Sequence, residues 1–171
     1  YYLMCGIFAI FNKNYNENLT ELFNSLQRLQ HRGKDGYGIV YVYETASLIT
    51  TKGEGELNNK MLKRIANVKS RSSIGHLRYS TSGYSLKTGK IQQKELQPLR
   101  GIIPDFEYCL AHNGNIPNVD GHDTSFLNRE IMRLNQTLSM EKRLINLMMN
   151  VPAAYCLLIL SPNALYAIRD R

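Results

Sequence analysis

A cysteine lies almost at the amino terminus, where it could act as a nucleophile that carries its own base. Met4 and three further residues precede Cys5, and Gly6 follows it. If residues 1–4 were removed, Cys5 would hold a thiol and a free α-amine, whose unperturbed pKa of about 7.7–8.0 suits it to accept the thiol proton near neutral pH. Gly6 would let a substrate carbonyl approach the backbone closely. The alternative is that Cys5 only begins a buried strand.

The elements that must position such a nucleophile follow from the periodicity of apolar residues. The expected strands cover residues 5–11, 39–43, 48–52, 73–79, 107–112, 154–160 and 164–168. The expected helices cover residues 19–30, 58–66 and 123–134, with a fourth that begins after Ser139. Polar turns are expected at 12–18 and 161–163, and a glycine-rich loop at 31–38.

Helix starts and inward faces can also be predicted. The residues placed to cap the four helices are Asn18 (with Glu21 completing a capping box), Asn58, Asp123 and Ser139. In the last helix, Leu144, Ile145, Leu147 and Met148 are expected to point inward. Strands come first, then helices, then strands again, joined by hairpin turns. This order favours two mostly antiparallel sheets covered by helices over a βαβ alternation.

Composition limits the class of protein. A length of 171 residues indicates one domain, 1–171, with a sizeable core. The chain has no apolar run long enough to span a bilayer and no secretory signal pattern. The three cysteines (Cys5, Cys109 and Cys156) indicate reduced thiols in a cytoplasmic protein, with the second and third buried, rather than disulfides or a zinc site.

The net charge of +7 raises the question of an anionic partner such as nucleic acid. The basic residues are scattered, and the densest cluster, within 60–71, lacks interleaved aromatic residues. No nucleic-acid-binding motif accompanies that cluster. We therefore interpret it as a solvated helix face and expect neither a nucleic-acid nor a membrane partner.

Five stretches carry a family resemblance: 5–8 (Cys-Gly-Ile-Phe), 29–33, 75–83, 111–115 and 123–124. In order and spacing they resemble the glutaminase domain of the class II glutamine amidotransferases, which use an amino-terminal nucleophile. The most similar branch is that of the glutamine phosphoribosylpyrophosphate amidotransferases, which the triplet at 97–99, Gln-Pro-Leu, also fits.

The resemblance implies a role for each motif. Cys5 attacks the glutamine carboxamide, and Asn113 and the Gly114 N–H stabilise the oxyanion. Arg78 binds the substrate α-carboxylate, and Asp123 binds its α-ammonium.

Further residues are implied to bind substrate or to support the site. Tyr79 and Thr81 belong to a loop that closes over glutamine, with its glycines as hinges. The remaining residues implied to be structural near the site are Arg32, Gly33, His76 and His112.

The resemblance also implies an architecture and a reaction. The fold expected is α+β, a four-layer α/β/β/α sandwich of the Ntn-hydrolase type, truncated at the carboxyl end, with the synthase or phosphoribosyltransferase domain absent. The reaction is hydrolysis of L-glutamine to L-glutamate and ammonia, without cofactor or metal, to supply purine nucleotide biosynthesis. The partner is a domain or subunit that accepts the ammonia.

Residues 1–4 are the main departure from the family pattern, because they make the Cys5 nitrogen a peptide nitrogen. They are either a leader or extra residues, and activity would require their removal. An alternative is an inactive glutamine-binding or regulatory relative with an unprocessed amino terminus. A second departure is Ser125, which replaces an acidic residue. A rival mechanism is a Cys–His enzyme with His76 or His112 as base.

Simpler interpretations of the same residues exist. Asn113-Gly114 could be a type I′ turn, the commonest meaning of Asn-Gly. Asp123 could be only a helix cap, and Arg78 could be a surface charge on a strand.

Overall fold

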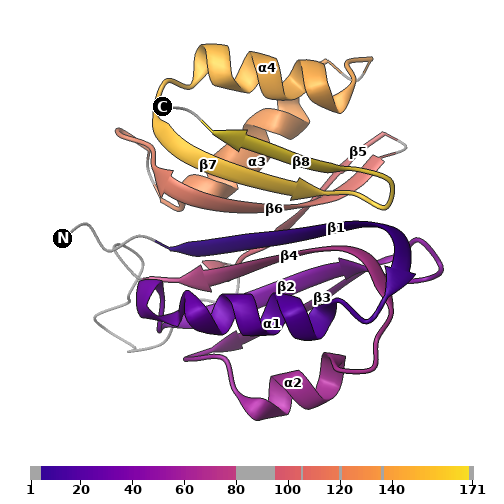
Figure 1. Ribbon diagram of the computed structural model, residues 1–171. Helices are drawn as coiled ribbons and strands as arrows, with labels where there is room; N and C mark the ends of the chain where they lie inside the picture. Colours follow the sequence, from indigo (N-terminus) through magenta and orange to yellow (C-terminus); the bar gives the residue numbers. More distant parts are fainter. Residues whose placement is uncertain (1–4, 80–94, 105, 120, 136, 170–171) are drawn as a thin grey trace.

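Four layers make up the protein, as the computed structural model shows (Figure 1). The structure describes residues 5–79, 95–104, 106–119, 121–135 and 137–169. Two sheets pack face to face, each covered on its outer side by two helices. The helices are α1 (Leu19–Arg28) and α2 (Asn59–Ile65) on the first sheet, and α3 (Asp123–Arg133) and α4 (Met140–Asn150) on the second.

The first sheet has the strand order β1-β4-β2-β3, with all neighbours antiparallel. Its strands are β1 (Gly6–Asn16), β2 (Gly36–Val42), β3 (Leu48–Glu54) and β4 (Ser70–Arg78). A short 3-10 helix, η1 (Gln30–Arg32), follows α1 and leads into β2. The carboxyl end of β4 therefore lies beside the start of β1.

The second sheet is an antiparallel meander with the order β5-β6-β7-β8. Its strands are β5 (Leu99–Ile103), β6 (Phe106–Asn115), β7 (Ala154–Leu160) and β8 (Leu165–Arg169). Helices α3 and α4 lie between β6 and β7 in the sequence and cover the outer face of this sheet.

Three apolar clusters hold the layers together. The cluster between the two sheets consists of Val40, Val42, Ile74, Cys109, Ala111 and Leu160. The cluster under α1 and α2 includes Phe23 and Ile39, and the cluster under α3 and α4 includes Leu127 and Leu144. Cys109 is buried as expected, whereas Cys156, near the start of β7, is only half-buried and corrects that expectation.

Most of the expected strands and helices are present. The strand expected at 154–160 is β7, with the same bounds. The polar turn expected at 12–18 is wrong, because β1 continues to Asn16 and pairs there with β4. Strand β5 was not expected, since its five residues follow a long polar stretch and have no alternating pattern.

Two of the four predicted caps are correct. The side chain of Asn58 accepts a hydrogen bond from the Met61 N–H at 3.2 Å, and Ser139 accepts one from Lys142 at 3.4 Å. Asn18 holds the N-cap position of α1, but its side chain makes no capping bond; its Nδ2 instead donates to the Ser70 carbonyl at 2.8 Å.

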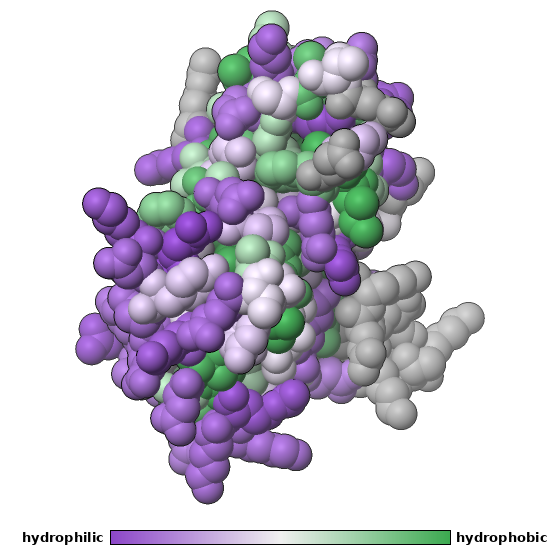
Figure 2. All heavy atoms as spheres, turned by 90° about the vertical axis from the view of Figure 1, so that its right-hand side faces the viewer, coloured by the Kyte–Doolittle hydropathy of each residue, from purple (hydrophilic) through white to green (hydrophobic). Residues whose placement is uncertain are grey.

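The part of the basic cluster that lies on α2 is on its solvated side, as expected, whereas Arg71 lies in β4 and donates to the Pro162 carbonyl at 2.6 Å. Lys60, Lys63 and Arg64 are exposed, whereas Met61 and Ile65 face the sheet. The lower end of the molecule, where α2 lies, is largely hydrophilic in the space-filling view (Figure 2). Among the described residues, no helix is long and apolar enough to cross a membrane.

Helix α4 differs from the expected inward face. Ile145 and Met148 are exposed, with 56% and 37% of their surface accessible, whereas Arg143 is fully buried. The Arg143 guanidinium donates to four backbone carbonyls of the α3–α4 connection, those of Ile131, Leu134, Asn135 and Leu138, at 2.6–3.1 Å. A buried cation therefore organises this connection.

Replacing Arg143 by Met should lower the free energy of unfolding by about 3 kcal/mol or more, because several buried carbonyls lose their donor. Chemical denaturation followed by circular dichroism measures the change. The exposed neighbour Lys142→Met is the control and should change stability by less than about 0.5 kcal/mol. Equal effects of the two substitutions would contradict this role for Arg143.

Candidate functional site

The alternation of side chains along β1 and β4 directs two candidate residues to the same place. Ile7 and Ile74 both pack in the cluster between the sheets. Residues at even spacing along a strand share a face, so Cys5, two positions before Ile7, and Arg78, four positions after Ile74, face the same gap. Gly6 of β1 pairs with Leu77 of β4, so the adjacent residues Cys5 and Arg78 lie close together at the end of the sheet.

The loop after α1 holds the backbone on both sides of this point. Gly33 packs against β4 so closely that a Cβ there would lie 2.8 Å from the Arg78 carbonyl carbon. The Asp35 N–H donates to the Arg78 carbonyl at 3.1 Å, and Arg32 Nε donates to the Cys5 carbonyl at 3.5 Å. Arg32 and Gly33 therefore contact the backbone beside Cys5 and Arg78.

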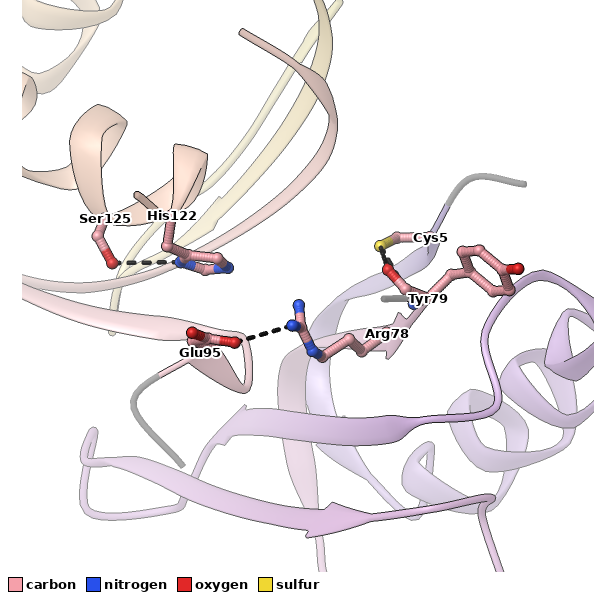
Figure 3. Close-up of polar contacts among 6 residues, drawn as sticks. All are labelled: Cys5, Arg78, Tyr79, Glu95, His122 and Ser125. Carbon is pink, nitrogen blue, oxygen red and sulfur yellow. Dashed lines mark hydrogen bonds and ion pairs between the residues drawn. The ribbon is translucent and has the colours of Figure 1, made fainter. Parts of the chain in front are cut away.

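The Cys5 thiol contacts the backbone of Tyr79 (Figure 3). Its sulfur accepts from the Tyr79 N–H at 3.5 Å, and the S–H reaches the Tyr79 carbonyl at 3.8 Å. Burial raises the pKa of Cys5, against the opposing effects of the Tyr79 hydrogen bond and of the charges on Arg78 and Arg32. A raised pKa keeps the thiol protonated at neutral pH, so that attack by this sulfur needs a base.

Arg78 forms a buried ion pair with Glu95. Its Nη2 lies 2.8 Å from the Glu95 Oε2, and the two side chains are only 5% and 11% exposed. Arg78 is thus not a surface charge. Nothing in the sequence pattern links these two residues, because 17 positions separate them and no helix or strand period relates them.

The residues after Glu95 connect the two sheets at this end. The Gln97 Oε1 accepts from the His112 N–H of β6 at 2.6 Å. On the other side, Lys52 of β3 donates its Nζ to the Leu96 carbonyl at 2.6 Å. Gln97 was expected only as part of a family motif, and here it contacts the second sheet directly.

Two histidines are oriented by α3. His112 Nδ1 lies 3.3 Å from the Thr124 hydroxyl, and His122 Nδ1 lies 3.2 Å from the Ser125 hydroxyl. Ser125 therefore contacts a ring at the edge of the site.

All three histidines near Arg78 are neutral at neutral pH. Burial lowers the pKa of His76 to about 3 and the pKa values of His112 and His122 to about 4. Smaller contributions come from neighbouring histidines at His76 and His112, and from Arg78 at His76 and His122. Among the described residues, the hydrogen bonds of the Cys5 sulfur are to the Tyr79 backbone, and none joins it to a histidine ring.

Asp123 is the first residue of α3, but it does not cap the helix. His122 holds the cap position, and Asp123 Oδ2 instead accepts from the Ile116 N–H at 3.0 Å. The carboxylate therefore points back towards the chain that leaves β6, and the helix-cap interpretation is wrong.

Asn113 and Gly114 lie within β6 and pair with Cys156 and Tyr155 of β7, so they are not a type I′ turn. Gly114 approaches β7 so closely that a Cβ there would lie 2.4 Å from the Ala154 oxygen. The buried Oδ1 of Asn113 has no hydrogen-bond partner among the described residues.

Two adjoining cavities share His122 and Asp123. The smaller, of about 40 Å³, is lined by Cys5, Arg78, Tyr79, Gln97, His112, Gly114, His122, Asp123 and Thr124. The larger, of about 490 Å³, is lined by Glu95, residues 115–119, Gly121, His122 and Asp123.

Most of the residues expected at the site therefore meet at one end of the sandwich. Arg32, Gly33, His76 and Asn113 do not line the smaller cavity, and Thr81 lies outside the described residues. No three histidine, cysteine or carboxylate side chains of the described residues are grouped as a metal site would require. The sequence analysis assigned no role to Gln97, His122 and Thr124, which line the smaller cavity, or to Glu95, which pairs with Arg78.

Known relatives can now be compared with this geometry. No protein-family model matches the chain. The chain is 36% identical to the amidophosphoribosyltransferase of Pseudomonas aeruginosa over 119 residues, which is 68% of this chain and 22% of that protein. It is 28% identical to the amidophosphoribosyltransferase of Methanocaldococcus jannaschii over 98% of this chain and 38% of that protein.

A solved structure supports the same relationship. Glutamine phosphoribosylpyrophosphate amidotransferase from B. subtilis, complexed with ADP and GMP, matches with a TM-score of 0.72 and 25% identity, over 98% of this chain and 37% of that one. The chain thus spans under two fifths of these relatives. The expected α+β four-layer sandwich of the Ntn type is confirmed. The homologues of this chain are amidophosphoribosyltransferases, and it has the fold of their class II glutamine amidotransferase domain.

Proposed function

We propose that this chain is a glutaminase domain that hydrolyses L-glutamine to L-glutamate and ammonia through a γ-glutamyl thioester on Cys5. The observation that carries the proposal is the small cavity that Cys5, Arg78, Gly114 and Asp123 line together. A nucleophile, a cation, a backbone donor and an anion are the groups that acyl transfer from an α-amino acid amide requires.

In the proposed reaction, the Cys5 thiolate attacks the carboxamide carbon after the thiol proton passes to a base. The tetrahedral intermediate collapses to the thioester as the same base returns the proton to the leaving ammonia. Water then hydrolyses the thioester and releases glutamate. The Gly114 N–H and an amide hydrogen of Asn113 stabilise the oxyanion, each donor being worth roughly 2.7–4 kcal/mol.

The base is the α-amine of Cys5 once residues 1–4 have been removed. The raised pKa of the thiol makes a base necessary, and the lowered pKa values of His76 and His112 make both histidines weak proton acceptors. An amine with an ordinary pKa of about 7.7–8.0 is better matched to neutral pH.

At the substrate end, Arg78 binds the α-carboxylate and Asp123 binds the α-ammonium. Both line the same small cavity and carry opposite charges, which suits the zwitterionic end of an amino acid. Tyr79 supplies backbone contacts to the nucleophile, and Thr81 is proposed to contact glutamine on the family pattern alone.

We further propose a cytoplasmic setting in which the ammonia passes to a phosphoribosyltransferase domain or subunit for purine nucleotide synthesis. The relatives support this, since they are named amidophosphoribosyltransferases and are more than twice the length of the matched region.

A second candidate is a glutamine-binding domain that does not hydrolyse its ligand. It is favoured by the peptide nitrogen of Cys5 in a chain that retains residues 1–4. The two candidates share the binding groups and differ only in the base.

A glutamine-like affinity label should add once, on Cys5, in a chain from which residues 1–4 have been removed. Cys109 should not react, because burial raises its pKa to about 11 and shields it. Half-buried Cys156 is the more stringent control. Peptide mapping locates the label, and its appearance mainly on Cys109 or Cys156 would refute the assignment of the nucleophile.

Hydrolysis should require a free Cys5 amino group. A chain that begins at Cys5 should release ammonia at a rate that rises as the pH passes through the amine pKa, because the neutral amine is the base. A histidine base with a pKa of about 4 would instead give a rate that rises near pH 4 and is flat above it. His76→Ala and His112→Ala should retain hydrolysis if they remain folded. A Tyr1-start chain as active as the Cys5-start chain, together with one inactive histidine variant, would establish the Cys–His rival.

The proposed roles of Arg78 and Asp123 in binding the substrate can be tested by measuring the affinity for L-glutamine. Arg78→Lys should weaken L-glutamine binding about tenfold or more, since an ammonium cannot form two parallel hydrogen bonds with a carboxylate. Asp123→Asn should have a similar effect, because its oxygen can still accept from Ile116 while the negative charge is lost. Arg100→Lys is a matched control in an exposed ion pair with Glu107 at 2.8 Å. Calorimetry that finds unchanged affinity in both site variants would exclude this pocket.

A further inference from the structure

Glu95 forms an ion pair with Arg78, and its position at the site is unexplained by the proposed reaction. The contact between Oε2 and Nη2 is 2.8 Å long and largely buried. Breaking a buried pair by removing one partner ordinarily costs several kcal/mol. Glu95 therefore fixes the guanidinium that the proposed function assigns to the substrate.

Glu95 also belongs to the wall of a cavity. With Asp123 it lines the 490 Å³ cavity, which meets the smaller cavity of Cys5 and Arg78 at His122 and Asp123. His122 has a pKa of about 4 and carries no charge at neutral pH. Among the described residues that line the two cavities, the charged side chains are thus Arg78, Glu95 and Asp123, and the Lys52 ammonium also acts on His122.

This arrangement suits one end of an α-amino acid. The α-carboxylate and α-ammonium are bonded to the same carbon, so the groups that bind them must be neighbours. A guanidinium has five N–H donors, and a carboxylate that engages one nitrogen orients the plane of the rest. A second carboxylate in the wall of the cavity that Asp123 also lines adds attraction for an ammonium and repulsion for an anionic ligand that lacks one.

We propose that Glu95 is a positioning and selectivity-determining residue: it orients Arg78 for the substrate α-carboxylate and, with Asp123, selects ligands that carry an α-ammonium. The inference rests on the proposed function, because it assigns the ligand of the same site. Glu95 takes no part in bond formation or proton transfer.

The backbone around Glu95 is suited to hold such a group. Lys52 donates to the carbonyl of Leu96, and Gln97 accepts from the His112 N–H, both at 2.6 Å. These contacts attach the residues after Glu95 to both sheets. Substitution of the carboxylate therefore leaves the backbone contacts of the segment in place.

The test compares two ligands in chains that carry Cys5→Ser, so that glutamine is not consumed. The ligands are L-glutamine and 4-carbamoylbutanoate, which is glutamine without its α-amine. Calorimetry measures both affinities in the starting chain and in Glu95→Gln, Glu95→Asp and Glu107→Gln. Glu107→Gln breaks an ion pair of equal length, 2.8 Å, with Arg100 away from the site.

Glu95→Gln should weaken glutamine binding about tenfold or more, in line with the loss of a charged hydrogen bond. The preference for glutamine over 4-carbamoylbutanoate should fall about threefold or more, because repulsion of the anionic analogue is relieved at the same time. Glu95→Asp should recover part of that preference, and Glu107→Gln should leave both affinities and their ratio unchanged.

Three results would overturn the inference. Tighter glutamine binding by Glu95→Gln would show that Glu95 competes with the substrate for Arg78. Equal losses for both ligands, with an unchanged ratio, would make Glu95 a purely structural residue. Unchanged affinities for both ligands in Glu95→Gln would show that Glu95 takes no part in ligand binding. A starting chain that binds no glutamine would instead refute the proposed function itself.

Discussion

The pairing of β1 with β4 is the constraint on which the site depends. Gly6 lies opposite Leu77, so the residues just beyond this pair, Cys5 and Arg78, meet at the end of the sheet. Side chains alternate along a strand, and a shift of one residue in this register would turn every side chain of β1 to the other face. Cys5 would then point towards α1 instead of into the gap between the sheets. The buried contacts of Ile7 and Ile74 oppose such a shift.

The second sheet contributes the remaining residues of the candidate site, which are positioned by contacts at the end of β6. Gly114 permits close contact with β7, and Asp123 bonds to the Ile116 N–H, so the end of β6 and the start of α3 are joined directly. Acidic and donor groups of the second sheet thus face the thiol and guanidinium of the first. The charged groups are few and mostly buried, which strengthens their interactions compared with those at an exposed surface.

The sequence was sufficient to predict the layers, because periodicity and turn residues act locally. Asn58 and Ser139 cap their helices as predicted, and each accepts from an N–H only three residues along the chain. Asn18 and Asp123 were predicted to be caps by the same rule, but each bonds to a backbone group that only the tertiary fold brings near.

The buried position of Arg143 was missed, because an arginine on a helix resembles a surface residue in the sequence. Glu95 could not be found either, since its pairing with Arg78 depends on the folded path of the chain. The roles of the individual site residues remain predictions.

The two sheets meet at the site, and this has a consequence for the energetics of the whole domain. Residues 96 and 97 bond to β3 on one side and β6 on the other. Any ligand that contacts both Arg78 of the first sheet and Asp123 of the second would add a further link across the same gap. Such a ligand binds only while the two sheets are packed as in the folded domain, so its binding free energy adds to the free energy of unfolding. The fraction of the domain that holds ligand and its stability against unfolding therefore rise together.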